Sequence, residues 1–565
     1  MDDSWMTSGA GHPRRWAILA VLVVSLLVVV LDNTVLNIAL PTIQKDLNAS
    51  QGELVWAIDS YTLSFAALLF TMGVLGDRYG RKKILSFGLF TFGVASAICA
   101  FSSSGGMLIG WRAVMGVGGA AVLPVTLAII TVVFPPHERG KAIGLWAGAV
   151  GGAIALGPVL GGVLLQNPQW LNWLTGNDWG SVFLINVPIV AVGLFFIWRI
   201  VPETKNPNAA KLDFRGLIIS ATGMFLLVYG IIHASETKAW LVAPVVLPIV
   251  LGAGIIALFI VLESKSDHAS FDVTLFKNRG YAVSLAAVSL AFFALSGITF
   301  TLPFYFQIVR GFGTFAAGMC FVPFAVGQLL AAPRSGGMVM KFGYRKVMTT
   351  GLSIVSLALL GLMFVNETTP IWMTLVIFFF FGFGMGNVIA PASTLMQNVL
   401  PLARAGAGSA VQNTVRQLGG ALGVAIIGTL LATRYAANLS EAFAKSPIPV
   451  SVPAQEAASQ SLVATMGVID QLPPDAAPLL QSFRDGAFEA YVSASHFTTL
   501  ISLVIIVTAA LIVGFGLPLI TPPSQHAAPG GPPLDPMDAL VKEEGAAYAA
   551  EAGSEFEQPE SQAKN

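Results

Sequence analysis

Apolar segments long enough to cross a lipid bilayer recur along nearly the whole chain, with short polar stretches between them. A helix needs roughly 20 residues to cross the hydrocarbon core. Fourteen segments are near or above that length, so the pattern predicts an all-α protein that crosses the membrane fourteen times. The predicted spans are residues 16–40, 53–75, 84–102, 107–134, 142–165, 181–200, 214–233, 240–262, 281–309, 315–340, 347–366, 371–399, 407–433 and 497–520.

The basic residues between the spans support an even number of crossings. With the N-terminus placed in the cytoplasm, 21 of the 30 Lys and Arg residues fall on the cytoplasmic side, six fall outside and three fall within spans. Cytoplasmic loops of membrane proteins carry an excess of Lys and Arg. A missed or extra span would invert every later loop. The distribution therefore predicts a multi-pass protein of the cytoplasmic membrane with both termini in the cytoplasm.

A weak internal repeat divides the chain. Gly336–Met348 aligns with Gly73–Leu85 after a shift of 263 residues. Many membrane transporters are built from such repeats, which predicts two six-helix halves with two extra helices between them. The expected units are residues 1–15 as a cytoplasmic N-terminus, 16–200 as the N-terminal half, 201–280 as the extra helices and their linkers, 281–520 as the C-terminal half with an external loop at 435–496, and 521–565 as an acidic, disordered cytoplasmic tail. Within the external loop, residues 476–491 have the composition of a short amphipathic helix.

Composition excludes several classes of protein. Hydrophobic residues make up 55% of the chain and charged residues only 11%, whereas about 25% charged is usual for soluble domains. The formal net charge is zero, which argues against a nucleic-acid partner. The two cysteines and six histidines are scattered at no metal-ligand spacing, and the sequence has no GxxxxGK[ST] phosphate loop. We therefore expect no metal, no cofactor, no ATP and no enzymatic site.

A charged stretch interrupts the apolar pattern between the second and third spans. Gly73–Leu85 reads GVLGDRYGRKKIL, and its glycines and charged residues predict a tight loop at the cytoplasmic face. The Asp77 carboxylate is expected to meet Arg81 or the N-terminus of a neighbouring helix. The stretch resembles, at every defined position, the loop signature of the major facilitator superfamily, which implies a secondary transporter. In that family this cluster acts as a gate latch. The matching residues here are Gly73, Asp77, Arg78, Gly80 and Arg81.

Three of the ionisable residues within predicted spans are candidates for coupling. Asp32 lies well inside the first span, Asp59 in the second and Arg112 in the fourth. A charge in hydrocarbon is expensive and is usually paired or faces a water-filled cavity. We expect Asp32 to pair with Arg112 or a bound cation, because an acid held between burial and an opposite charge can load and release a proton near neutral pH. Asp59 is a second candidate acid, with a solvated role at the outer surface as the open alternative.

The strings around these residues extend the resemblance. LDNTVLNIALP, which contains Asp32, is similar to a pattern of the 14-span drug:proton antiporter branch of the superfamily. RAVMGVGGA, which starts at Arg112, is similar to a superfamily motif whose arginine is tied to proton coupling. FLINVP (Phe183–Pro188) and RQLGGALG (Arg416–Gly423) resemble the branch's sixth and thirteenth spans more weakly.

The fifth span gives the direction of transport. AIALGPVLGG resembles the antiporter motif that marks exporters in the family, although Ala153 replaces its first glycine. The matching residues are Gly157, Pro158, Gly161 and Gly162. Glycines spaced along one helix face let a neighbouring helix approach closely.

The expected substrate cavity lies between the two halves. Apolar walls with few charges suit varied lipophilic compounds, which are bound by burial. Possible lining residues are Asn33, Asn37, Trp56, Tyr61 and Arg416.

The resemblance implies a proton-coupled antiporter that exports amphipathic or lipophilic compounds, such as drugs, dyes and cations, by alternating access. Its partners would be these small molecules, protons and the lipid bilayer. The alternative is a dedicated exporter of one lipid, siderophore or secondary metabolite, because the coupling residues would be the same. A membrane enzyme with its site in 435–496 would need convergent nucleophile, base or metal ligands, which that segment lacks. A non-transporting sensor would not need the charges at Asp32, Arg112 and Arg416.

Overall fold

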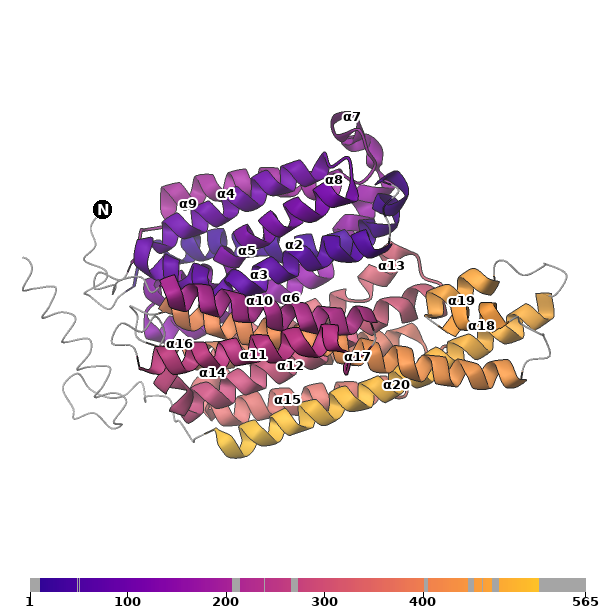
Figure 1. The fold of residues 1–565 in the computed structure, drawn as a ribbon. Coiled ribbons are helices and arrows are strands. Elements are labelled where there is room, and N and C mark those ends of the chain that lie inside the picture. The colour runs from indigo at the N-terminus through magenta and orange to yellow at the C-terminus, as the bar shows by residue number, and fades with distance from the viewer. Residues whose placement is uncertain are drawn as a thin grey trace, which may run out of the picture.

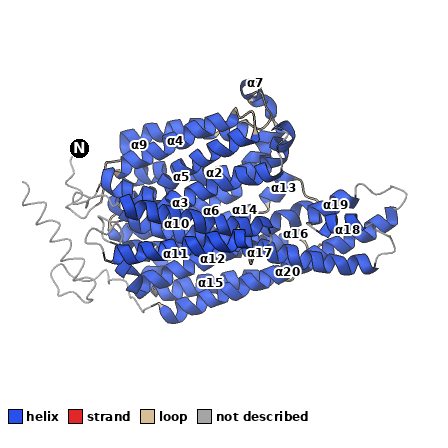
Figure 2. Cartoon of the chain, in the orientation of Figure 1, coloured by secondary structure: helices blue, strands red, loops and turns tan. Residues whose placement is uncertain are grey.

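The computed structural model describes residues 11–47, 49, 51–205, 214–237, 239–265, 273–400, 405–445, 452–459, 461–469 and 477–517. These residues are almost entirely helical, and none of them forms a β-strand (Figure 2). The prediction of an all-α protein is confirmed.

The helices of the N-terminal half lie together as one bundle, coloured indigo to purple in Figure 1. Its first five long helices are α2 (Arg15–Leu47), α3 (Gln51–Tyr79), α4 (Arg81–Ala100), α5 (Gly105–Val133) and α6 (Pro136–Gln166). The sixth crossing is made of α8 (Ser181–Leu184) and α9 (Asn186–Ile200), which Ile185 joins. The short helices η1 (Pro168–Trp170) and α7 (Asn172–Thr175) connect it to α6.

Two further helices, α10 (Phe214–Thr237) and α11 (Ala243–Ser264), follow the first bundle in the chain. α10 packs against α3 of the N-terminal half and α17 of the C-terminal half, and α11 packs against α10. Large apolar side chains of α11, such as Leu247 and Val250, are exposed. This outer position agrees with the extra helices that the sequence predicts between two halves.

The C-terminal half forms the second bundle, coloured pink to yellow in Figure 1. Its long helices are α12 (Arg279–Phe304), α14 (Val322–Phe342), α15 (Tyr344–Leu362), α16 (Ile371–Val399), α17 (Ala405–Lys445) and α20 (Ala477–Gly516). Its shorter elements are η2 (Val273–Lys277), the π-helical turn η3 (Tyr305–Val309), α13 (Thr314–Met319), α18 (Val452–Ser459) and α19 (Leu462–Ile469).

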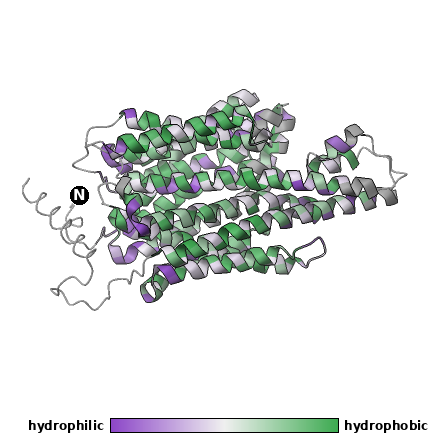
Figure 3. Ribbon diagram, turned by 60° about the horizontal axis from the view of Figure 1, so that its bottom comes forward, coloured by the Kyte–Doolittle hydropathy of each residue, from purple (hydrophilic) through white to green (hydrophobic). Residues whose placement is uncertain are grey.

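Thirteen helices among the described residues are long and apolar enough to cross a membrane. The remaining predicted span, 142–165, coincides with α6, a helix of 31 residues that packs against α2 and α14. Apolar residues run along the bundle, and polar residues gather where the chain enters α2 and leaves α20 (Figure 3). We call this the terminal end, and the end that carries α18 and α19 the extension end (Figure 1).

Polar residues and proline mark where several helices begin. The Ser104 side chain accepts a hydrogen bond from the Met107 N–H at 3.3 Å and caps α5. The Asn278 side chain accepts one from the Tyr281 N–H at 3.2 Å and caps α12. Pro136 occupies the first turn of α6, where its missing N–H costs no hydrogen bond. Local sequence therefore sets these boundaries.

The connection between α3 and α4 is a single residue and not the loop that the sequence predicts. α3 continues through Asp77 to Tyr79, Gly80 has a φ of 115°, and α4 begins at Arg81. Gly343, which the internal repeat aligns with Gly80, likewise separates two helices and has a φ of 81°. Positive φ values favour glycine, so the aligned glycines make the same sharp corner in each half.

The expected external loop at 435–496 is largely helical in its described parts. α17 continues to Lys445 and α20 begins at Ala477, so both helices project past the bundle (Figure 1). α18 and α19 pack against these projections, and the Tyr435 and Thr465 hydroxyls are 2.6 Å apart. Hydropathy reports where a helix leaves the hydrocarbon and not where it ends, so the sequence did not show how far α17 continues into this segment. The predicted amphipathic helix near 476–491 is the start of α20.

Candidate functional site

Asp32 and Arg112 form a buried ion pair between α2 and α5. Arg112 Nη1 donates a hydrogen bond to Asp32 Oδ2, and the Arg112 and Asp32 side chains are 0% and 1% exposed. Asp32 Oδ1 accepts a second hydrogen bond from Asn186 Nδ2 at 3.0 Å. Each carboxylate oxygen therefore has a partner, as a charge held away from water requires.

The Arg112 guanidinium is satisfied on all three nitrogens. Nε donates to the Ala57 carbonyl at 3.0 Å, and Nη2 lies 3.4 Å from Asn33 Oδ1. Its carbon lies 4.4 Å from the centre of the Tyr61 ring, which adds a cation–π contact. The structure thus brings Asp32, Arg112, Asn33 and Tyr61 together.

Two polar residues that the sequence analysis did not propose complete this site. Asn186 Nδ2 also lies 3.0 Å from Ser96 Oγ, and Ser96 donates to the Phe183 carbonyl at 2.9 Å. We call Asp32, Arg112, Asn186 and Ser96 the Asp32 cluster. The FLINVP string contains Asn186 and was a signal for it, whereas nothing in the sequence around Ser96 sets it apart.

Asp59 and Trp56 lie on a different face of α3. Trp56 and Leu63 pack against residues of α10, and the Trp56 ring centre is 6.1 Å from that of Tyr229. Asp59 is three residues after Trp56 and four before Leu63, so it shares their helix face. The structure therefore places Trp56 at the junction with α10, away from the Tyr61 side of the helix.

Asp77 joins the two halves at the terminal end. Its Oδ1 accepts hydrogen bonds from Arg81 Nε at 2.9 Å and Nη2 at 2.7 Å. Its Oδ2 accepts one from the Ala407 N–H, in the first turn of α17, at 2.9 Å. Both expected contacts are therefore present, and a carboxylate at a helix N-terminus is favoured by the helix dipole.

The surroundings of Asp77 tie the corner at Gly80 to the segment after α9. The Arg81 N–H donates to the Thr204 carbonyl at 2.9 Å, and the Lys82 N–H donates to Glu203 Oε1 at 3.0 Å. Arg78 lies over the Tyr79 ring, and Gly73 is buried within α3. Sequence reasoning missed Glu203 and Thr204, because no motif marks them.

Further contacts between the halves lie at the terminal end and at mid-helix. Ser409 Oγ donates to the Pro124 carbonyl at 2.8 Å, and Thr131 Oγ1 lies 3.3 Å from Gln397 Oε1. Gln328 Nε2 donates to the Ala147 carbonyl at 3.0 Å. The described helices are therefore closed against one another at the terminal end.

Glycines of α6 bring it close to α14 and α2. A Cβ on Gly144 would collide with the Ala332 carbonyl of α14, and the Gly140 Cβ position is 3.5 Å from Gly336 Cα. A Cβ on Gly157 would collide with the Thr34 hydroxyl, two residues after Asp32. The antiporter-like segment therefore touches the helix that carries Asp32.

Gly161 and Gly162 of the same antiporter-like segment are also buried. Gly162 lies near Phe315 of α13, at 3.8 Å from its Cβ position. The side chains of Pro158 and Asn37 lie outside the described part of the chain.

Arg416, on α17, is a further buried cation. It is 5% exposed, and its guanidinium carbon lies 5.8 Å from the Trp146 ring of α6 and 5.1 Å from the Phe292 ring of α12. Its Nε has no hydrogen-bond partner among the described residues. Aromatic faces stabilise a cation only in part, so this side chain differs from Arg112.

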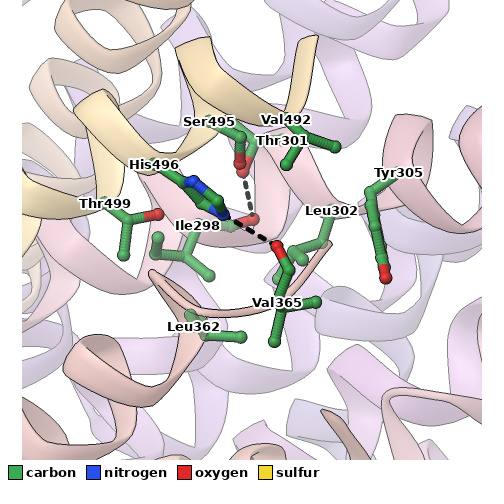
Figure 4. A pocket seen from close by; sticks show the side chains of 10 residues that line it. All are labelled: Ile298, Thr301, Leu302, Tyr305, Leu362, Val365, Val492, Ser495, His496 and Thr499. Carbon is green, nitrogen blue, oxygen red and sulfur yellow. Dashed lines mark hydrogen bonds between the residues drawn. The ribbon is translucent and has the colours of Figure 1, made fainter. Parts of the chain in front are cut away.

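A small cavity lies within the C-terminal half, away from both arginines. His496 points toward the Val365 carbonyl, with Nε2 at 2.7 Å, and Thr301 and Tyr305 line the same space (Figure 4). All of its lining residues come from the C-terminal half. A site for alternating access needs surfaces from both halves, so this cavity is a packing feature of one bundle. Within the described residues, no three His, Cys, Asp or Glu side chains gather at metal-binding distance.

Comparison with known proteins places this geometry among transporters. A model described as Major Facilitator Superfamily matches residues 22–424. The chain is 31% identical to "Multidrug efflux pump LfrA" of Mycolicibacterium smegmatis over 504 residues, which cover 89% of this chain and 96% of that protein. It is 31% identical to "Methyl viologen resistance protein SmvA" of Salmonella typhimurium, over 85% of this chain and 93% of that protein.

Two other relatives are named for single compounds. The "Tetracenomycin C resistance and export protein" of Streptomyces glaucescens is 30% identical over 81% of this chain and 83% of its own length. The "Riboflavin transporter RibZ" of Clostridioides difficile is 28% identical over 75% of this chain and 90% of its own length.

Solved structures share the fold. The human organic anion transporter MFSD10 superposes with a TM-score of 0.56 at 16% identity, covering 88% of this chain and all of that chain. The proton:xylose symporter XylE superposes with a TM-score of 0.56 at 14% identity, covering 92% of this chain and 97% of that chain.

Proposed function

The chain belongs to the Major Facilitator Superfamily, and from that premise we propose that it is a proton-coupled antiporter that exports amphipathic, lipophilic compounds. It would sit in the cytoplasmic membrane with the terminal end in the cytoplasm, as the distribution of Lys and Arg favours. Inward proton movement would drive outward movement of the compound by alternating access of the two halves.

The observation that carries this proposal is the buried pair of Asp32 and Arg112. A proton that enters the cluster competes with Arg112 for the same carboxylate oxygen. Breaking a buried ion pair is costly, by roughly 3–5 kcal/mol when one partner loses its charge. Protonation of Asp32 would therefore destabilise the arrangement in which the pair is formed and shift the balance toward one that does not depend on it.

The cytoplasmic closure would be held by Asp77. Its carboxylate bridges Arg81 on its own side and the N-terminus of α17 on the other. Opening toward the cytoplasm requires that the Ala407 hydrogen bond break and that α6 separate from α14. A latch of this kind holds the closed state without a covalent link, and its strength sets how often the site opens inward.

The relatives support a range of substrates. Two of them are named for multidrug efflux and for resistance to methyl viologen, which favours export of drugs and dyes. The narrower candidate, a dedicated exporter of one metabolite, is favoured by the relatives named for tetracenomycin C and riboflavin.

The test is transport by the full chain in proteoliposomes under an imposed pH gradient. Ethidium, the neutral dye acridone and the anion acridine-9-carboxylate would be compared, with protein-free vesicles as the background. We expect at least one dye to move with the gradient, and Asp32→Asn to reduce that movement by more than about tenfold, since its amide cannot ionise.

The matched control is Asp178→Asn, because Asp178 is exposed outside the bundle. It should transport as the wild type does. Dye movement that is unchanged in Asp32→Asn would refute the coupling role of Asp32. The absence of gradient-driven movement for every dye, in correctly folded protein, would refute multidrug export and leave the dedicated exporter.

A further inference from the structure

Arg416 occupies a junction to which both halves contribute. Trp146 comes from α6 of the N-terminal half, whereas Phe292 and Arg416 come from α12 and α17 of the C-terminal half. The Trp146 indole N–H donates to Thr126 Oγ1 at 3.1 Å, so its ring is fixed against α5. The guanidinium therefore lies between two aromatic walls that would move apart when the halves separate.

Close packing of α17 on α12 holds the cation in this place. A Cβ on Gly419 would collide with the Ser289 carbonyl, and one on Gly423 with the Phe293 carbonyl. These glycines follow Arg416 by one and two turns, on a face where the two backbones nearly touch. Arg416 is thus positioned by rigid backbone contact and does not depend on a partner side chain.

Three buried polar side-chain atoms on this part of α17 lack hydrogen-bond partners among the described residues, and they belong to Asn413, Thr414 and Arg416. Arg416 Nε is a buried donor and Asn413 Oδ1 a buried acceptor without a hydrogen bond among the described residues. The Asn413 side chain is 1% exposed, and its Nδ2 donates to the Ser409 carbonyl at 2.8 Å. Residues three apart lie on the same helix face. Unsatisfied buried polar groups are rare because they cost free energy. The Arg416 Nε donor and the Asn413 Oδ1 acceptor are therefore suited to a ligand that carries both an acceptor and a donor.

The charge at this junction is uncompensated. Asp32 and Arg112 neutralise one another, whereas none of the ion pairs within the described residues includes Arg416. A permanent cation placed between Trp146 and Phe292 would meet a like charge in a medium that screens poorly. An oxygen acceptor would instead form a charge-assisted hydrogen bond with the guanidinium.

We infer that Arg416, Asn413, Trp146 and Phe292 form the substrate contact site, and that this site prefers flat aromatic compounds carrying a carbonyl, carboxylate or phenolate oxygen over permanent cations. The inference rests on the proposed export function and names its substrate class. The rings of the compound stack against Trp146 and Phe292. Its oxygen accepts from Arg416, and a donor such as a hydroxyl or ring N–H satisfies Asn413.

The test is equilibrium binding to the purified full chain in detergent, without any pH gradient. Three tricyclic dyes of similar size are compared: acridine-9-carboxylate (an anion), acridone (neutral, with a carbonyl) and N-methylacridinium (a permanent cation). We expect the first two to bind at least about tenfold more tightly than the third, because hydrogen bonds to a charged donor are the strong ones.

Arg416→Gln should remove that preference. Arg416→Lys should still bind acridine-9-carboxylate more tightly than N-methylacridinium, but it should bind acridone more weakly than the wild type does. Arg334→Gln is the matched control, since Arg334 lies on the exposed face of α14, and it should bind all three dyes as the wild type does. If Arg416→Gln fails to fold, two results still test the inference: the order in which the wild type binds the three dyes, and the change in that order in Arg416→Lys.

Equal or tighter binding of the cation by the wild type would overturn the inference. So would failure of all three dyes to bind, or an unchanged order in folded Arg416→Gln. Each of these results is independent of proton coupling. Gradient-driven transport could still be present in such a protein, so failure here is distinguishable from failure of the proposed function.

Discussion

Arg112 and Arg416 are both buried cations inside a membrane protein, yet their surroundings differ. Arg112 has a carboxylate, a carbonyl, an amide and an aromatic ring around it. Arg416 has two aromatic rings, and its Nε has no partner within the described structure. A site that binds a proton must hold its charges in balance when the substrate is absent. A site that binds a substrate gains by leaving hydrogen-bonding capacity open.

The comparison suggests a division of labour between the halves. The proposed proton site is built from α2, α4, α5 and α9 of the N-terminal half, and the proposed substrate site is centred on α17 of the C-terminal half. Trp146 on α6 is the part of the N-terminal half that reaches the substrate site. Binding there and protonation at Asp32 would be coupled through the packing of α6 against α2, where Gly157 touches Thr34.

The largest expected difference between the two arginines is in stability. Arg112→Gln leaves Asp32 buried with Asn186 as its remaining partner, and breaking a buried pair costs about 3–5 kcal/mol. Arg416→Gln removes a buried charge that has no acidic partner in the described structure, and is expected to be neutral or stabilising. Thermal unfolding of the full chain in detergent measures both. Equal losses would contradict the contrast, and Asp32→Asn combined with Arg112→Gln should recover part of the loss.

The next effect concerns how the two sites communicate through α6. Gly144→Ala places a methyl group against the Ala332 carbonyl, and forcing atoms into a packed interface costs about 1–3 kcal/mol. Transport should fall sharply because α6 can no longer close on α14. Gly152→Ala is the matched control, since its Cβ would lie 3.8 Å from Leu329. Similar transport rates in the two variants would argue against close α6–α14 contact in the cycle.

Binding and transport should separate between the two sites. Arg416→Gln is expected to weaken the binding of acridine-9-carboxylate by about tenfold, since a hydrogen bond to a charged group contributes about 1.5–3 kcal/mol. Asp32→Asn, whose neutral amide resembles the protonated carboxyl, should also weaken binding of this ligand, because a ligand that displaces the Asp32 proton binds the protonated state less tightly. It should keep the preference for acridine-9-carboxylate over N-methylacridinium, which Arg416→Gln removes. Fluorescence titration of the purified variants with each dye measures these affinities. Loss of the preference for the anion over the cation in Asp32→Asn would merge the two sites into one.

The smallest expected effect lies at the surface of the terminal end. Arg15 Nε lies 2.6 Å from Glu138 Oε2, and this hydrogen bond lowers the pKa of Glu138. The pair therefore stabilises the fold at neutral pH, and the contribution is lost as the pH falls through the lowered pKa. For a partly exposed pair we expect at most about 1 kcal/mol. Arg15→Gln should lower the unfolding temperature slightly at pH 7 and have no effect at acid pH. An equal effect at both pH values would show that the charge pair is not the cause.

The sequence predicted much of the fold because spans in a membrane are long, apolar and strongly patterned. It also anticipated the partners of Asp32 and Asp77, since few charges are available to pair within hydrocarbon. Asn186 and Ser96 were missed because their contact with Asp32 joins helices far apart in the chain, and neutral polar residues are common in spans. The continuation of α17 to Lys445 was missed because polar helical turns outside the membrane carry no hydropathy signal. The packing of Trp56 against Tyr229 could not be predicted, because it depends on the position of α10, which the sequence did not give.

The central claim is that Asp32 exchanges its proton against substrate bound elsewhere. The most direct measurement is proton release when acridine-9-carboxylate binds to the purified full chain in weakly buffered detergent, with wild type and Asp32→Asn side by side. By linkage, a ligand that disfavours the protonated state must displace protons, so the wild type should release up to about one proton per ligand. Asp32→Asn should bind the ligand and release none. Release that persists in Asp32→Asn, or wild-type binding without release at any pH, would contradict the account.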